Sequence, residues 1–144
     1  MGNHRTSSWR LVAVFLAFAP LGGRAQVEIP SKYVLPELTE VTRLDVAGPE
    51  RGTSDRSTIT AFRRSFYIDQ QAFVIQREEN RKYFLLILAA PHNFTGTCAR
   101  RPQAIMRAGG TYFLMCDSNA IAIARAYQFD DAEQMERVTS TLKP

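Results

Sequence analysis

The stretch Lys82-Tyr-Phe-Leu-Leu-Ile-Leu88 decides the fold of this chain. Successive side chains of a β-strand point to opposite faces, and here both alternating sets are apolar. One set is Tyr83, Leu85 and Ile87, and the other is Phe84, Leu86 and Leu88. Because a strand that is apolar on both faces must be covered on both sides, the stretch predicts the centre of a sheet with a packed layer on each face.

Further β-like runs precede this stretch. Residues 58–62, 65–68 and 72–76 are rich in isoleucine, phenylalanine, valine and threonine. The polar residues 77–81 separate the last of these runs from residues 82–88, and this arrangement predicts a hairpin.

Two more strands are expected after it. Gly109-Gly110 predicts a second hairpin with 111–116 as its outgoing strand, because glycine tolerates the positive φ of tight turns. Residues 121–127 alternate large side chains with alanines at positions 122, 124 and 126. Strict alternation gives this strand one face of methyl groups, which another element can approach closely.

The carboxy-terminal segment predicts a helix. Asp130 is the expected N-cap, and Glu133 would complete a capping-box-like pair. A spaced apolar stripe follows, made by Ala132, Met135, Val138 and Leu142. We expect this helix to lie on the alanine face of residues 121–127. The predicted fold class is α+β: an antiparallel sheet of about five or six strands with a C-terminal helix, or a partly closed barrel of the same strands.

Residues 1–25 have the order of an export signal. A basic end with Arg5 and Arg10 precedes the apolar run 11–19, and small residues at positions 23 and 25 precede an expected cut before Gln26. The run is much shorter than the roughly 20 residues that a permanent membrane anchor needs. We therefore expect a periplasmic or secreted protein with no transmembrane anchor after cleavage.

Cleavage would leave residues 26–144, enough for one domain. We expect an irregular N-terminal lead-in at 26–56 and a β-rich globular domain with the C-terminal helix at 57–144. The whole chain has 18 basic and 14 acidic residues, but three of the arginines lie in the signal. Because the remaining chain is close to neutral, its charge gives no reason to expect a nucleic-acid partner.

Cys98 and Cys116 are the only cysteines. In an exported chain such a pair favours one structural disulfide, which would stabilise the fold by about 3 kcal/mol. Free or intermolecular thiols are the alternative. Two thiols alone fall short of the four protein ligands of a typical structural zinc site, and the carboxylates show no ligand spacing. Neither a metal nor a cofactor is predicted.

Function is less well specified by the residues. The favoured hypothesis is a non-enzymatic binding or interaction module for an unidentified envelope or extracellular component. Its candidate contact surface combines the 89–104 loop with a hairpin tip and contains Arg100, Arg101 and Arg107. One alternative is a small hydrolase or isomerase that uses His92, the only histidine after residue 25, with a carboxylate. Another is a carrier of a small apolar ligand inside a partly closed barrel.

Three segments resemble a group of short exported proteobacterial proteins that are catalogued as a domain of unknown function. The segments are Arg64-Ser-Phe-Tyr-Ile-Asp69, Ala72-Phe-Val-Ile75 and residues 82–88. That group shows a strand, a D-x-x turn, a second strand and a Y-L-x-x-L strand, followed by a cysteine and a terminal D-x-I strand. Cys98, Cys116 and Asp117…Ile121 hold the later places here, with altered spacing. The resemblance spans residues 57–125. It implies a bacterial periplasmic setting and brings no activity or catalytic residues with it.

Overall fold

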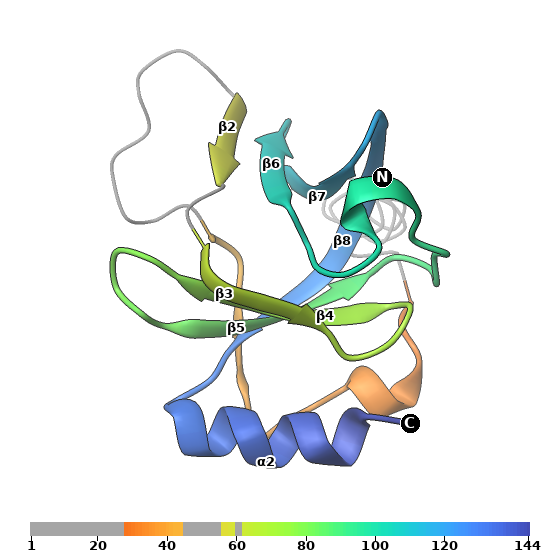
Figure 1. Ribbon diagram of the computed structural model, residues 1–144. Coiled ribbons are helices and arrows are strands. Elements are labelled where there is room, and N and C mark those ends of the chain that lie inside the picture. Colours follow the sequence, from red (N-terminus) through yellow and green to blue (C-terminus); the bar gives the residue numbers. More distant parts are fainter. Residues whose placement is uncertain (1–27, 45–55, 60–61) are drawn as a thin grey trace, which may run out of the picture.

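The computed structural model describes residues 28–44, 56–59 and 62–144. These residues form a curled antiparallel sheet, a half-barrel, and one helix packs against its outer face (Figure 1). The expected α+β class is confirmed. The predicted signal at 1–25, its cut before Gln26 and residues 45–55 of the predicted lead-in lie outside the described residues.

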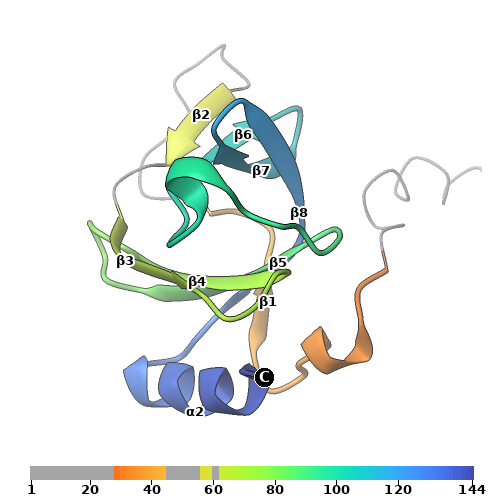
Figure 2. The same cartoon turned by 45° about the vertical axis from the view of Figure 1, so that its right-hand side comes forward.

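The described elements, in chain order, have the following bounds: η1 (Ser31–Tyr33), β1 (Thr39–Val41), β2 (Arg56–Ile59), β3 (Phe62–Tyr67), β4 (Ala72–Arg77), β5 (Tyr83–Leu88), η2 (Gly96–Cys98), β6 (Ala104–Ala108), β7 (Thr111–Cys116), β8 (Asn119–Gln128) and α2 (Ala132–Leu142). The strands neighbour one another in the order β2-β6-β7-β8-β5-β4-β3, and β1 pairs with β8. The curl brings β2, β6 and β7 over the face of β3, β4 and β5 that is opposite α2 (Figure 2). None of the described helices is long and apolar enough to cross a membrane.

Strand β5 is the central strand that its sequence predicts, flanked by β8 and β4. One of its faces packs on α2 and belongs to the helix-side cluster of buried residues: Tyr33, Leu38, Ile68, Ala72, Val74, Leu85, Ile87, Tyr127, Phe129, Met135, Val138 and Leu142. The other face lies inside the curl and belongs to the interior cluster: Leu44, Phe73, Ile75, Phe84, Leu86, Leu88, Ile105, Tyr112, Leu114 and Ala126. The two apolar faces of one strand thus join the two cores.

Strand β8 contains a β-bulge that the sequence pattern does not reveal. Ile87 pairs with Arg125 and Leu88 pairs with Ile123, which leaves Ala124 as the extra residue. The bulge reverses the alternation, so that Ile123 and Ala126 both pack in the interior cluster. The expectation of one continuous alanine face on β8 is therefore wrong. Helix α2 does not lie on these alanines and packs against Tyr127 instead.

The β6–β7 hairpin confirms the turn expected at Gly109-Gly110. Ala108 pairs with Thr111, so the loop has two residues, and their φ angles are 59° and 83°. Positive φ at both central positions is the requirement of a type I′ turn, which matches the natural twist of the strands.

The start of α2 lies one residue later than expected. Its N-cap is Asp131, whose side chain accepts a hydrogen bond from the Gln134 backbone N–H at 2.8 Å. Asp130 instead donates its backbone N–H to the Gln134 side-chain oxygen at 2.6 Å. Because of this shift Ala132 is exposed, and Gln134 is buried with the rest of the apolar stripe.

Residues 28–44 are part of the domain rather than an irregular lead-in, which corrects the expectation for this segment. They contain η1 and β1 and contribute Tyr33, Leu38 and Leu44 to the two cores. Leu44 is fully buried: its N–H donates to the Tyr112 hydroxyl at 2.9 Å, and its carbonyl accepts from the Arg77 guanidinium. The sheet has eight strands instead of five or six, and the short strand β1 is one that the sequence did not predict.

Candidate functional site

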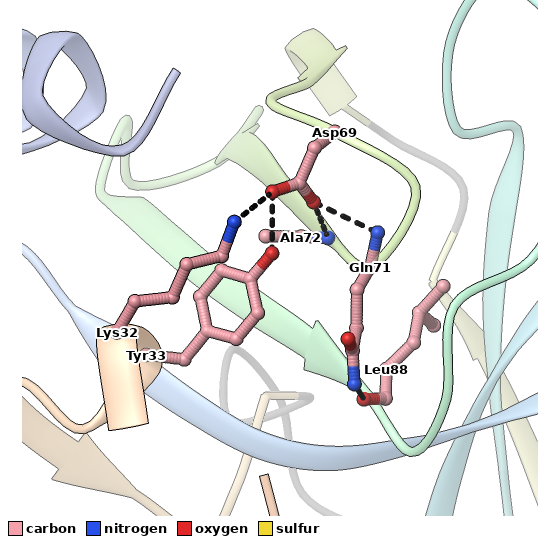
Figure 3. Close-up of polar contacts among 6 residues, drawn as sticks. All are labelled: Lys32, Tyr33, Asp69, Gln71, Ala72 and Leu88. Atoms are coloured by element: carbon pink, nitrogen blue, oxygen red, sulfur yellow. Dashed lines mark hydrogen bonds and ion pairs between the residues drawn. The ribbon is translucent and has the colours of Figure 1, made fainter. Parts of the chain in front are cut away.

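The turn between β3 and β4 contains the most densely hydrogen-bonded carboxylate of the described chain (Figure 3). One oxygen of Asp69 accepts from the backbone N–H groups of Gln71 and Ala72, at 2.8 and 2.9 Å, which is an Asx turn. The other oxygen accepts from the Tyr33 hydroxyl and from the Lys32 ammonium, the latter at 3.2 Å. The carboxylate therefore attaches η1 to the β3–β4 turn.

The electrostatics of this cluster favour an ionised Asp69 and a neutral Tyr33. Burial is the largest single effect on Asp69 and would raise its pKa, but the hydrogen bonds from Tyr33, Gln71 and Lys32 together outweigh it and lower the pKa. Burial, followed by the bond to the Asp69 carboxylate, raises the pKa of Tyr33. Because both oxygens of Asp69 are already occupied by donors, the cluster acts as a structural clamp rather than as a catalytic base.

The sequence could reveal only part of this clamp. Asp69-Gln70-Gln71 between two β-like runs is a recognisable turn, and an aspartate at its start is the usual Asx residue. Tyr33 and Lys32 lie more than thirty residues earlier, so no local pattern connects them with Asp69.

The long 89–104 loop is attached to the edge of the sheet. Near its start, the His92 backbone N–H donates to the Gln70 carbonyl at 2.9 Å, and the Gln70 side chain donates to the Asn93 amide oxygen at 2.7 Å. Phe94 stacks on Tyr67 with ring centroids 4.3 Å apart.

The second half of the loop is attached in the same way. The Tyr67 hydroxyl donates to the Cys98 carbonyl at 2.8 Å, and the Ser65 hydroxyl donates to the Pro102 carbonyl at 3.2 Å. The Gln103 side chain donates to the carbonyls of Thr97 and Arg101, at 2.9 and 3.2 Å. The loop is thus held along its length by strand β3, the β3–β4 turn and its own side chains.

His92 lies in this loop and is half-buried, with its ring 5.2 Å from that of Phe94. Its backbone N–H is bonded to the Gln70 carbonyl, and among the described residues no carboxylate forms an ion pair with the imidazole. Within the described residues no group of three histidine, cysteine or acidic side chains could hold a metal ion. The described part of the chain therefore does not bring His92 together with a carboxylate, as the hydrolase or isomerase alternative requires.

Cys98 and Cys116 lie next to each other beneath the loop, both buried and both as free thiols. Cys98 contacts the Met115 carbonyl at 3.4 Å, and Cys116 contacts the Thr95 carbonyl at 3.8 Å. Burial and the hydrogen bond with Cys116 raise the pKa of Cys98 to about 12. Since only the thiolate is strongly nucleophilic, this environment does not favour a catalytic cysteine.

The disulfide predicted from the sequence stays a prediction, and counting free thiols tests it. We expect protein recovered from an oxidising compartment to show no reactive thiol when it is unfolded without reductant. After reduction, it should show two. Oxidation of this pair should raise the free energy of unfolding by about 3 kcal/mol, because the closed loop restricts the unfolded chain. Two reactive thiols before reduction would contradict the disulfide.

The three arginines of the predicted contact surface lie on two different elements, the loop and strand β6. Arg100 and Arg101 are exposed in the loop before β6, whereas Arg107 is half-buried near the far end of β6, opposite Tyr112. At about 3.3 Å per strand residue, Arg107 lies about 10 Å beyond Ala104, where the strand begins. Arg100 and Arg101 are the two that lie side by side and are exposed.

The interior of the half-barrel is filled by its own side chains. Every member of the interior cluster is at most 8% exposed. Among the described residues, this packing leaves little room for an apolar ligand between the cluster's own side chains.

No family model, no curated protein and no solved structure matches this chain. The resemblance to short exported proteobacterial proteins consequently stays a prediction.

Proposed function

We propose that this chain is an exported, non-enzymatic binding module that recognises an acidic site on an envelope or extracellular partner through Arg100 and Arg101. The proposal of export rests on the sequence of residues 1–25. The proposal of binding rests on one structural observation: the loop that presents the two arginines is held in place by side-chain hydrogen bonds and ring stacking.

A preorganised loop supports a recognition role for a thermodynamic reason. A flexible loop must be ordered when a partner binds, and this ordering reduces the affinity. Here the Gln103 amide fixes the backbone of Arg101, and the carbonyls of Cys98 and Pro102 are bonded to β3. The backbone that carries the arginines is therefore already ordered in the free protein.

The chemistry of the two side chains indicates the kind of partner. Arg100 and Arg101 are exposed, and no described carboxylate forms an ion pair with either of them. A guanidinium group donates two parallel hydrogen bonds to a carboxylate or phosphate, and adjacent arginines can engage two such groups. We therefore infer an acidic partner surface rather than an apolar one.

The test replaces Arg100 and Arg101 together with serine. The wild-type protein, immobilised as residues 26–144, should retain a partner from an envelope or extracellular fraction, and the affinity for that identified partner is then measured. We expect the double variant to bind at least about tenfold more weakly, since each charge-assisted hydrogen bond to a surface partner contributes about 1 kcal/mol or more.

The control replaces Arg63 and Arg137, which are exposed on β3 and α2, with serine. This pair removes the same charge from other surfaces, so the affinity should change little apart from a general salt-dependent effect. Arg107→Ser is measured separately because this residue lies on β6 and is half-buried. Unchanged binding by the Arg100 and Arg101 double variant, with an unchanged unfolding temperature, would exclude the proposed surface.

A further inference from the structure

Among the described residues, one edge of β8 has no pairing strand in its middle. On the other edge the strand pairs with β5 from Ile123 onwards. On the open edge, the pairing with β7 ends at Ala122, and the pairing with β1 begins at Ala126. Residues 123–125 consequently have no described strand beside them on this edge.

The bulge at Ala124 explains the gap. Strand β8 changes partner there, from β7 in one half of the curled sheet to β1 and β5 in the other. Continued in register, Thr111 would oppose Ala124 and Thr42 would oppose Arg125, but β7 and β1 diverge before they reach these positions. Corners at which a strand passes between two sheets are a usual place for bulges.

A pocket of about 290 Å³ lies at this gap. Its walls include Val41, Tyr112, Ile123 and the small side chains of Ala122, Ala124 and Ala126. Two charged residues, Glu40 and Arg125, also line it, with their side chains paired at 3.5 Å. The volume is at the lower end of the range for ligand pockets, roughly 300 Å³ and above, so the occupant is small.

We propose that this pocket binds a short extended peptide with small apolar side chains, which completes the open edge of β8. An open strand edge presents backbone donors and acceptors, and an extended peptide is the ligand that satisfies both. At about 3.3 Å per residue, the three residues of the gap accommodate a peptide of two or three residues.

The walls and the rim determine the side chains and the ends of this peptide. With a volume of about 290 Å³ and with alanine and valine side chains in its walls, the pocket has room for small apolar side chains. The Glu40 carboxylate or the Arg125 guanidinium can pair with one charged end of the peptide, because the two groups lie 3.5 Å apart and an extended peptide of this length separates its ends by more than that. This site lies on β8 and is separate from the arginine loop.

The test uses trialanine with free ends and the isotope-labelled protein, residues 26–144. We expect saturable changes in the amide resonances of residues 40–42, 110–112 and 123–125. A trialanine methylated on its central amide nitrogen is the matched ligand control. It should bind at least about tenfold more weakly, because it keeps both charges but lacks a strand-pairing donor.

Two variants test the pocket from the side of the protein. Ala124→Leu fills the pocket and should weaken trialanine binding at least about tenfold. Ala120→Leu lies on the same strand, at an exposed position outside the pocket, and should bind like the wild type. If Ala124→Leu does not fold, the affinities of the wild-type protein for the two peptides still test the proposed strand pairing.

Three results would overturn the proposal. They are the absence of a saturable change at millimolar trialanine, equal affinity for the methylated peptide, and changes confined to Glu40 and Arg125, which would indicate ionic contact alone. Concentration-dependent changes at residues 123–125 without any peptide would instead assign the open edge to a second copy of the chain and would also refute it.

Discussion

Replacing Leu86 with alanine should lower the free energy of unfolding by about 2–5 kcal/mol. Leu86 is fully buried at the centre of β5, where it pairs with Phe73 on β4 and with Ala126 on β8. Both neighbours belong to the same interior cluster, so the truncation leaves a cavity that the surrounding strands cannot easily fill.

Urea unfolding followed by circular dichroism measures this change. The midpoint should fall while the dependence on urea concentration stays the same, as expected for a change in stability alone. Val34→Ala is the matched control, because Val34 is a large apolar residue that is 48% exposed, and its loss should stay within about 0.5 kcal/mol. A loss below 1 kcal/mol for Leu86→Ala would mean that the interior cluster is not close-packed.

Replacing Asp69 with alanine should lower the free energy of unfolding by about 2–4 kcal/mol at neutral pH. The substitution removes the acceptor of four hydrogen bonds and leaves the Gln71 and Ala72 N–H groups without their partner. Lys32→Ala removes the exposed ion pair and the contact of its ammonium with the Tyr33 ring, 4.9 Å from the ring centroid, and should cost at most about 1 kcal/mol.

The same residue makes stability depend on pH. Because the pKa of Asp69 is lower in the folded protein than its ordinary value, the ionised form stabilises the fold. This contribution is fully present above the ordinary aspartate pKa of about 4, and it is lost as the pH falls through the lower pKa of the folded state.

Asp69→Asn separates charge from hydrogen bonding. The amide oxygen of asparagine can still accept from Gln71 and Ala72, so this variant should be more stable than Asp69→Ala at neutral pH. It should also lose the part of the acid destabilisation that comes from this group. Urea unfolding at pH 7, 5 and 3 measures both effects, and a variant with the full acid sensitivity of the wild type would show that Asp69 is not responsible.

Local patterns predicted those parts of the fold that local physics determines. The doubly apolar stretch at 82–88 has one stable environment, the middle of a covered sheet, and β5 occupies it. Gly109-Gly110 likewise adopts the one turn that both residues favour.

Other features depend on contacts between distant segments, and the sequence alone did not reveal them. The bulge at Ala124 arises where β8 changes partners, so a strictly alternating sequence gave the wrong face. Tyr33 and Leu44 belong to the cores because of bonds to Asp69, Arg77 and Tyr112, which are far along the chain. In the candidate contact surface, Arg100 and Arg101 are neighbours because they are adjacent in the sequence. Arg107 is separated from them because it lies near the far end of β6, where it pairs with Tyr112.

The pairing of β1 with β8 has a consequence for the order of events during synthesis. Thr39 near one end of the described domain aligns with Gln128 near the other, and β8 also holds β5 and β7 together. Contacts between such distant segments form slowly, because a long loop must close before they contribute. The nascent chain therefore cannot complete its sheet until almost all of it has left the ribosome. During that interval it stays unfolded enough to pass through a narrow channel.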